Sequence, residues 1–164
     1  VCIDISTGLI IGIVSTFILL LWRISRPHIA VIGLIEGTQH FRNIQRHHVL
    51  TSSKLLSMRI DENLNFLNAH IFKGFLINAV SQHIDLEHVV INCSSISSID
   101  LSAVEMLEDV NAELNKLNIK LHLSEIKGPV MDKLQHSKLL KHLSGKIYLT
   151  HFQAMQQLSP EVFK

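Results

Sequence analysis

The sequence predicts an α/β fold, a small sandwich of a mostly parallel sheet with helices, preceded by one transmembrane helix. An uncharged run extends from Ile5 to Trp22, and the residues before Trp22 hold a single ionisable acid, Asp4. All 15 Lys and Arg residues lie at Arg23 or later. Beyond Pro27, strand-like and helix-like runs alternate. This order is typical of crossover connections and a largely parallel sheet.

The uncharged run is long enough to cross a membrane. At ~1.5 Å per residue it spans ~27 Å, close to a hydrocarbon core of ~30 Å. Trp22 stands at one end, where an amphipathic ring suits the membrane interface. Arg23 and Arg26 follow at once, so the positive-inside rule places this end in the cytoplasm and makes both arginines candidate membrane-proximal contacts. Pro27 then ends the helix.

Two other interpretations of this run are weaker. A secretory signal peptide carries its positive charge before the apolar run and a small-residue cleavage site after it, which is the reverse of this order. A buried core helix is usually shorter and shows a clearer polar stripe. Gly8, Gly12 and Thr16 share a small-residue spacing that lets helices approach closely in lipid. Either this face packs on sibling helices of a bundle, or the glycines are simply common in membrane helices.

The part after the span contains five expected strands and four expected helices. The strands are expected at residues 29–35, 55–60, 88–93, 119–123 and 146–150. The helices are expected at residues 66–82, 100–117, 129–140 and 152–158. The domain boundary falls near Pro27. It separates the final span and juxtamembrane linker, residues 1–27, from a cytoplasmic domain, residues 28–164.

Two of the expected helices have informative faces. In the helix at 100–117 one face is apolar and should point to the core; its members are Ala103, Leu107, Val110, Leu114 and Leu117. The helix at 66–82 has two neighbouring apolar stripes, one of Leu67, Ile71, Phe75 and Ala79 and one of Phe72, Leu76 and Val80. A single wide core face would account for both. A second exposed stripe, of Phe72, Leu76 and Val80, would instead contact a membrane bundle, a second subunit or a soluble partner.

Composition excludes several functions. The formal net charge is +1, with one Trp and one Tyr, so neither charge nor base stacking favours nucleic-acid binding. Cys2 and Cys93 flank the apolar run, so a membrane would keep them apart, and two cysteines alone make no zinc site. Cys93 is expected to be a small core residue. No Gly-x-Ser-x-Gly, phosphate-binding glycine loop or His-Glu-x-x-His motif is present, so no enzyme activity, cofactor or metal is expected.

Several segments together resemble the SulP family of anion permeases, at its last transmembrane helix and C-terminal STAS domain. The junction Trp22–Pro27 resembles the end of the last SulP span. The segment Gly37–His47 is similar to the loop after the first STAS strand of bacterial members, and Arg59–Ala69 resembles their R-x-D-x-x-L-x-F-x-N-A stretch. Ile99–Ala103 matches the STAS signature turn, and Glu125–Leu134 resembles a further family segment. These similarities occur in the family's order and cover almost the whole chain.

The resemblance implies a STAS-type sandwich that regulates or supports a secondary transporter of sulfate, bicarbonate or dicarboxylates. It implies a multi-pass protein of the bacterial inner membrane with its STAS domain in the cytoplasm. The implied partners are the upstream transmembrane bundle, the lipid bilayer, a second copy in a homodimer and a soluble cytoplasmic protein. The alternative is a membrane-tethered STAS module that signals by partner switching.

The STAS signature turn supplies a candidate regulatory site. Asp100 is a good N-cap, since its carboxylate can accept a hydrogen bond from the amide of Ser102 or Ala103. Ser102 then lies in the first helical turn, where a phosphate would meet free amides and the positive end of the helix dipole. In the similar anti-sigma-factor antagonists the matching residue is the phospho-acceptor. Leu101 and Ala103 depart from the Ser and Gly usual there, so Ser102 is either a phospho-acceptor or part of a simply capped turn.

A second candidate surface is basic. His40, His47 and His48 lie near Arg42 and Arg46, without the regular spacing and carboxylate that a metal site would need. Because this segment follows the span closely, it is expected either to touch lipid headgroups or the transporter's cytoplasmic face, or to be a solvated loop.

Overall fold

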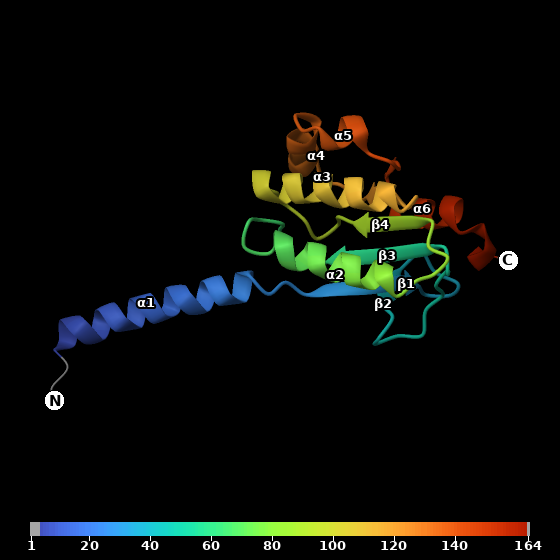
Figure 1. The fold of residues 1–164 in the computed structure, drawn as a ribbon. Coiled ribbons are helices and arrows are strands. Elements are labelled where there is room, and N and C mark those ends of the chain that lie inside the picture. The colour runs from blue at the N-terminus through green and yellow to red at the C-terminus, as the bar shows by residue number, and fades with distance from the viewer. Residues whose placement is uncertain (1–3, 164) are drawn as a thin grey trace.

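A computed structural model describes residues 4–163 of the chain. Its first element, α1 (Ile5–Ile24), projects from the rest of the molecule as a single straight helix (Figure 1). None of its residues is buried, and its length and composition suit a membrane span. Thr16 Oγ1 donates to the carbonyl of Gly12 at 2.8 Å, which satisfies a polar side chain inside the apolar run. The helix ends at the Ser25 cap, just before Pro27.

A six-stranded sheet forms the centre of the domain, in the order β2-β1-β3-β4-β5-β6. Strands β3, β4, β5 and β6 run parallel, whereas β1 is antiparallel to both of its neighbours. The mixed, mostly parallel α/β sandwich expected from the sequence is confirmed. The strand bounds are β1 Ile29–Leu34, β2 Phe41–Asn43, β3 Leu55–Ile60, β4 His88–Asn92, β5 Lys120–Ser124 and β6 Ile147–Tyr148.

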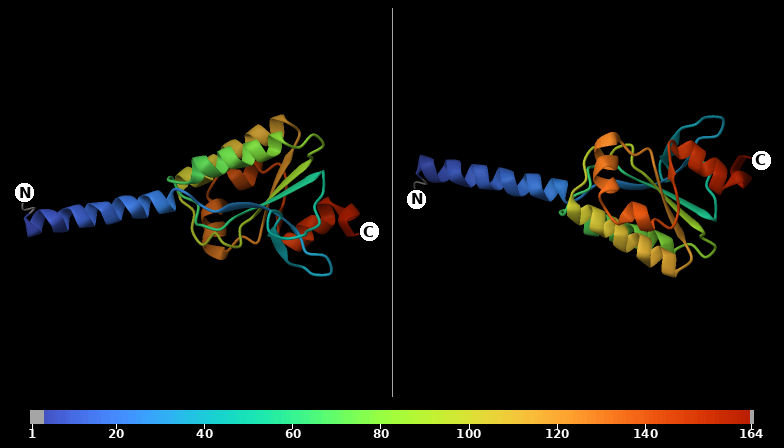
Figure 2. Two further views of the ribbon diagram at one scale, coloured as in Figure 1. Left: turned by 90° about the horizontal axis from the view of Figure 1, so that it is seen from below. Right: turned by 90° about the horizontal axis from the view of Figure 1, so that it is seen from above.

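Helices cover both faces of this sheet (Figure 2). Along β3, Leu56, Met58 and Ile60 point to the larger core, under α2 and α3, because side chains alternate across a strand. Leu55 and its neighbours on the opposite face pack under α6. The helix bounds are α2 Ala69–Ser81, α3 Leu101–Lys116, α4 Gly128–Gln135, α5 Leu139–His142 and α6 His151–Leu158, with a short 3₁₀ helix at Pro160–Phe163.

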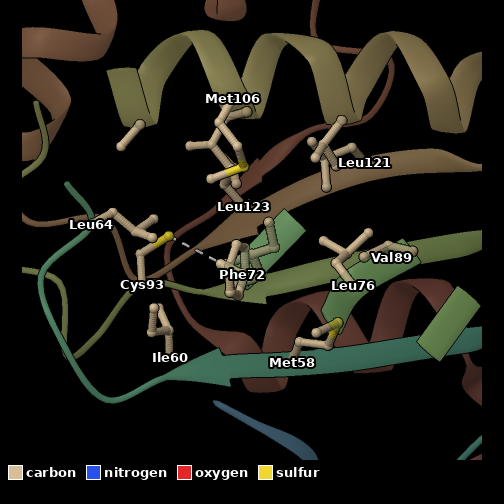
Figure 3. Close-up of a cluster of buried hydrophobic side chains, with 14 of the residues drawn as sticks. Met58, Ile60, Leu64, Phe72, Leu76, Val89, Cys93, Met106, Leu121 and Leu123 are labelled. Carbon is tan, nitrogen blue, oxygen red and sulfur yellow. Dashed lines mark hydrogen bonds between the residues drawn. The ribbon is translucent and has the colours of Figure 1, made fainter. Parts of the chain in front are cut away.

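The larger core consists mainly of Leu, Ile, Val and Met side chains (Figure 3). Phe72 from α2 is fully buried between the sheet and the helices. Cys93, at the end of β4, is buried in the same cluster, as the sequence predicts. Burial raises the pKa of this thiol to about 12. The side chain therefore behaves as a small apolar group.

Three details of the secondary structure differ from expectation. The segment expected to be a loop contains β2, because Phe41 pairs with Leu34 and is buried in the smaller core. The helix expected at 129–140 is two helices, α4 and α5. The carboxylate of Glu108 accepts hydrogen bonds from the amides of Lys138 and Leu139, which starts a new helix there. The last strand has only two residues.

Two predictions about helix faces are wrong. Phe72, Leu76 and Val80 do not form a partner surface, since all three are buried in the larger core. The other stripe of α2 is the more exposed one, with Phe75 at 38% exposure. Leu117 was expected to face the core but is 60% exposed, because α3 ends at Lys116 and the chain turns through a left-handed residue, Asn118.

Candidate functional site: the edge that carries the α3 N-terminus

The candidate site lies at one edge of the sheet. Because β1 is antiparallel to β3, its first residue, Ile29, stands beside the last residue of β3, Ile60. The chain therefore enters the domain where the parallel strands end and where α2 and α3 begin (Figure 1). In α/β sheets this edge is where ligands and regulatory groups usually bind. We call it the juxtamembrane edge, since α1 leads directly into it.

Asp100 organises this edge. Its Oδ1 accepts a hydrogen bond from the amide of Ala103 at 2.9 Å, which confirms the predicted N-cap of α3. Its Oδ2 accepts a second one, at 2.8 Å, from the amide of Phe66. One carboxylate thus caps a helix and also binds the loop that leads into α2.

A second contact holds the same two loops together. Asn63 Oδ1 accepts hydrogen bonds from the amides of Ser97 and Ser98 at 2.8 and 2.9 Å. Leu64 and Ile99 form a parallel bridge beside it. The two segments that precede α2 and α3 are therefore fixed to each other by backbone as well as side-chain bonds. Such a rim presents whatever side chains project from it in a defined position.

Ser102 projects from this rim into solvent. It lies in the first turn of α3 and its side chain is exposed, so a modifying enzyme would reach the hydroxyl. The first turn of α3 contains no acidic side chain, and the helix dipole is positive at this end. The turn would therefore accommodate added negative charge.

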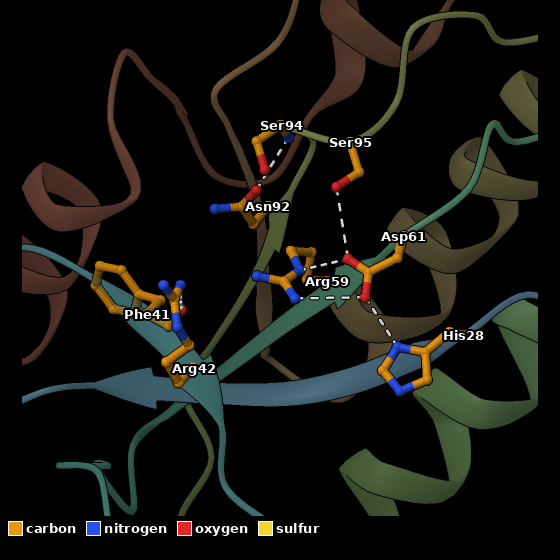
Figure 4. A network of polar contacts seen from close by, with 8 residues as sticks. All are labelled: His28, Phe41, Arg42, Arg59, Asp61, Asn92, Ser94 and Ser95. Carbon is orange, nitrogen blue, oxygen red and sulfur yellow. Dashed lines mark hydrogen bonds and ion pairs between the residues drawn. The ribbon is translucent and has the colours of Figure 1, made fainter. Parts of the chain in front are cut away.

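The linker after α1 is attached to the domain through Asp61 (Figure 4). Asp61 Oδ2 lies 2.8 Å from His28 Nδ1, and Asp61 Oδ1 accepts a hydrogen bond from Arg59 Nε at 2.6 Å. The amide of Asp61 also donates to the carbonyl of His28 at 2.9 Å. Partial burial alone would raise the pKa of Asp61, but the hydrogen bonds from Arg59 and His28 outweigh it and lower that pKa below its usual value.

The four arginines that are candidate membrane-proximal contacts lie in two separate parts of the molecule. Arg26 lies over the ring of Trp22, 4.5 Å from its centroid, so a cation–π contact joins two residues that both suit a membrane interface. Arg23 is exposed beside them. Arg42 stands opposite Gly33, in the second half of β1, and Arg46 lies in the turn after β2. The structure therefore places Arg42 away from the juxtamembrane arginines.

The histidines near Arg42 do not form a metal site. His40, His47 and His48 are exposed, and within residues 4–163 no three His, Cys, Asp or Glu side chains converge in a way that would hold a metal ion.

The family is settled by comparison with known proteins. The model of the STAS domain family matches residues 46–154, a range that includes both loops of the juxtamembrane edge and all of α3. The chain belongs to the STAS domain family. The match confirms the STAS part of the resemblance that the sequence shows.

The relatives of this STAS chain include transporters. It is 28% identical over 170 residues to the high affinity sulfate transporter 2 of Stylosanthes hamata; the match covers 96% of this chain and 26% of the relative. The chain thus spans about a quarter of the length of such relatives. Among solved structures, the murine Slc26a9 anion transporter in its inward-facing state has a TM-score of 0.78 at 14% identity, over 90% of this chain and 25% of that one. The anti-sigma factor antagonist SpoIIAA in its unphosphorylated form has a TM-score of 0.57 at 16% identity, over 68% of this chain and 93% of that one.

Sequence reasoning missed part of this STAS edge. Arg59 and Asp61 lie within a family-like segment, and nothing local in the sequence assigns them a role. Their signal is an Arg-x-Asp pair at the end of a strand, followed by a helix. Their partner, His28, lies 33 residues away, and only the antiparallel pairing of β1 with β3 brings it to Asp61.

Proposed function

We propose that the chain is the C-terminal part of a SulP-type secondary anion transporter, with α1 as its last membrane span. The STAS domain would regulate or support transport from the cytoplasmic side. The observation that carries this proposal is the direct connection of an unburied, span-length helix to a STAS domain by a linker of four residues, Ser25–His28, whose last residue is bonded to Asp61. A linker so short and so firmly attached would transmit movements between span and domain.

The transported anion would be of the sulfate, bicarbonate or dicarboxylate class. Sulfate is favoured among these, because the relatives that match this chain nearly end to end are called sulfate transporters. The chemistry of transport would belong to a membrane bundle upstream of this chain. The STAS domain itself would not be an enzyme.

The charges after α1 support an orientation for the span, and the family resemblance supports the rest of the proposed setting. We place α1 in the inner membrane of a bacterium, with Arg23 and Arg26 on the cytoplasmic side, and we divide the chain near Pro27 into span and domain. The partners would be the bundle, the bilayer, a second copy and a soluble cytoplasmic protein. The small-residue face of Gly8 and Gly12, which is open in the structure, supports packing on sibling helices.

Ser102 is the proposed point of regulation. It is exposed on the juxtamembrane edge, two residues after the Asp100 cap that links α3 to the loop before α2. Phosphorylation would add ≈ −1.5 to −2 charge at the juxtamembrane edge. Such a charge would change how this edge meets an anionic or cationic surface above it.

A membrane-tethered signalling module is the second candidate function. It is favoured by the likeness to SpoIIAA, which nearly spans that anti-sigma factor antagonist, and by the exposed Ser102. In this case partner switching would depend on a soluble protein, and α1 would serve only as an anchor.

The coding sequence upstream of Val1 distinguishes the two. Several further apolar spans would support the transporter, and a start codon just before Val1 would support the tethered module. For the transporter, labelled sulfate uptake by the full-length protein should fall when Asp61→Ala removes the side-chain bonds that join His28 and Arg59, while Asp132→Ala, an exposed carboxylate in α4, should leave uptake unchanged. Uptake that never exceeds that of cells without the protein, for sulfate, bicarbonate and dicarboxylates alike, would reject the transporter proposal.

A further inference from the structure

A basic cavity lies at the opposite edge of the sheet from α1. It has a volume of about 230 Å³ and opens where β4 and β5 begin. His88 and Lys120, the first residues of these strands, are register partners there. The other lining residues that can carry charge or donate hydrogen bonds to an anion include His122, Lys146 and Tyr148. The juxtamembrane edge, with Ser102, is at the other end of the same strands.

Hydrogen bonds fix the protonation of both imidazoles. The amide of Lys146 donates to His122 Nδ1 at 2.9 Å, so the proton of neutral His122 is on Nε2. That Nε2 lies 3.2 Å from His88 Nδ1, which must then accept. The proton of His88 is therefore on Nε2, and the ring offers a donor to its surroundings. Burial lowers the pKa of His122 to about 4, which keeps this ring neutral at neutral pH.

A glycine makes this arrangement sterically feasible. A Cβ at Gly145 would lie 2.5 Å from His122 Nδ1 and would also collide with the carbonyl of Leu121. Any larger residue would push the following amide, that of Lys146, away from the imidazole.

The cavity offers donors and positive charge, and the carboxylate charge that acts on its His88 is that of Glu87, which is not part of the lining. No Asp or Glu lines it, and within residues 4–163 neither Lys120 nor Lys146 forms an ion pair. Glu87, which precedes His88, is bonded to Lys54 at 2.5 Å. Tyr148 is 5% exposed and lines the cavity, so its hydroxyl is available as a further donor. Lys120, Lys146, His88 and Tyr148 thus all line one concavity.

We propose that this cavity binds a small tetrahedral oxyanion of the sulfate or phosphate class. Such an ion accepts hydrogen bonds in several directions at once, and its charge would be balanced by Lys120 and Lys146. Chloride would compete poorly, because it cannot present separate oxygens to the His88 and Tyr148 donors. The inference does not depend on the proposed transport function, since a tethered STAS module would carry the same cavity.

The test is a titration of the 164-residue chain in nanodiscs with sodium sulfate and with sodium phosphate, at constant ionic strength held by chloride. Saturable binding of at least one of the two oxyanions is expected. The double variant Lys120→Gln/Lys146→Gln should bind it at least about tenfold more weakly, because two charge-assisted contacts are lost. The matched control Lys138→Gln/Lys141→Gln removes two exposed lysines on another surface and should bind as the native chain does.

Nitrogen-15 spectra of the histidine rings locate the ion. Binding should shift the Nε2–H signal of His88 and leave that of exposed His136 unchanged. The proposal is overturned if neither oxyanion binds saturably over the chloride background, or if both double variants weaken binding equally. It is also overturned if binding occurs with no shift at His88, since the ion would then lie elsewhere.

Discussion

The carboxylate of Asp100 accepts a hydrogen bond from the amide of Phe66 across 34 residues of sequence, at 2.8 Å, while it caps α3. Helix capping is usually a local interaction. Here the same side chain also determines where the loop before α2 lies, so helix initiation and tertiary structure depend on one residue.

Replacing Asp100 should therefore lower the free energy of unfolding by more than the loss of a simple helix cap would. We expect Asp100→Ala to lower the free energy of unfolding by about 2 kcal/mol, because the amides of Ala103 and Phe66 both lose their acceptor. Asp100→Asn keeps one acceptor oxygen and should lose about half as much. Urea denaturation in detergent micelles, followed by circular dichroism, measures both. Asp132→Ala, in the exposed part of α4, is the control and should change the value by less than about 0.5 kcal/mol.

The assignment of α2 faces can be tested with two neighbouring residues. Leu76 is fully buried, so Leu76→Ala should destabilise the domain by about 2–5 kcal/mol. Phe75 is 38% exposed, so Phe75→Ala should cost less than about 1 kcal/mol. The same denaturation experiment compares them. A larger loss for Phe75→Ala than for Leu76→Ala would show that the faces are the other way round.

The Cys93 thiol should be unreactive toward alkylating reagents in the folded protein. Burial raises the pKa of this thiol to about 12, so almost no thiolate exists at neutral pH, and the residue is only 4% exposed. In a Cys2→Ser chain, iodoacetamide should label Cys93 only after urea is added, as mass spectrometry would show. Rapid labelling without denaturant would mean that the end of β4 opens readily.

Mild acid should weaken the fold through His151. This ring is fully buried, and burial, followed by the charge of Arg59, lowers its pKa to about 3. In the unfolded chain the ring binds a proton below about pH 6.5. The stability that depends on neutral His151 is thus present above pH 6.5 and is lost as pH falls toward 3. Between pH 7.5 and 5 the loss should be about 2 kcal/mol.

The control for acid sensitivity is a matched pair of variants. His151→Asn, whose side chain can still bond Ser124, should lose less stability than the native chain between pH 7.5 and 5. His136→Asn changes an exposed ring and should keep the native pH dependence. If all three chains lose stability equally, other groups cause the acid sensitivity.

Much of the fold follows from local pattern. The uncharged run, the apolar strand at β4 and the 3.6-residue period of α3 each carry their own signal. The N-cap at Asp100 was predictable for the same reason, since it depends on residues within three positions. The start of β2 was not predictable in this way. Phe41 is buried only because it pairs with Leu34 and packs edge-to-face against His151, with 4.5 Å between the two ring centroids.

The error about the faces of α2 has a tertiary cause. Phe72 and Phe75 are equally apolar, and the sequence alone does not say which stripe of α2 meets the sheet. The choice depends on the packing of α2 against α3 and the larger core, which is a tertiary effect. In the same way His28, Arg59 and Asp61 form a unit only after β1 and β3 pair. Contacts between distant segments, rather than local preference, therefore determine most of the juxtamembrane edge.

The proposed transporter requires that Ile5–Ile24 crosses a membrane with the STAS domain on the cytoplasmic side. The most direct test labels single cysteines in intact bacterial cells with a membrane-impermeant maleimide. Native Cys2, before the span, should react from outside. Ile84→Cys, at a site that is 99% exposed, should react in a Cys2→Ser chain only after the cells are permeabilised. Labelling of both positions from the same side would contradict a single crossing by α1.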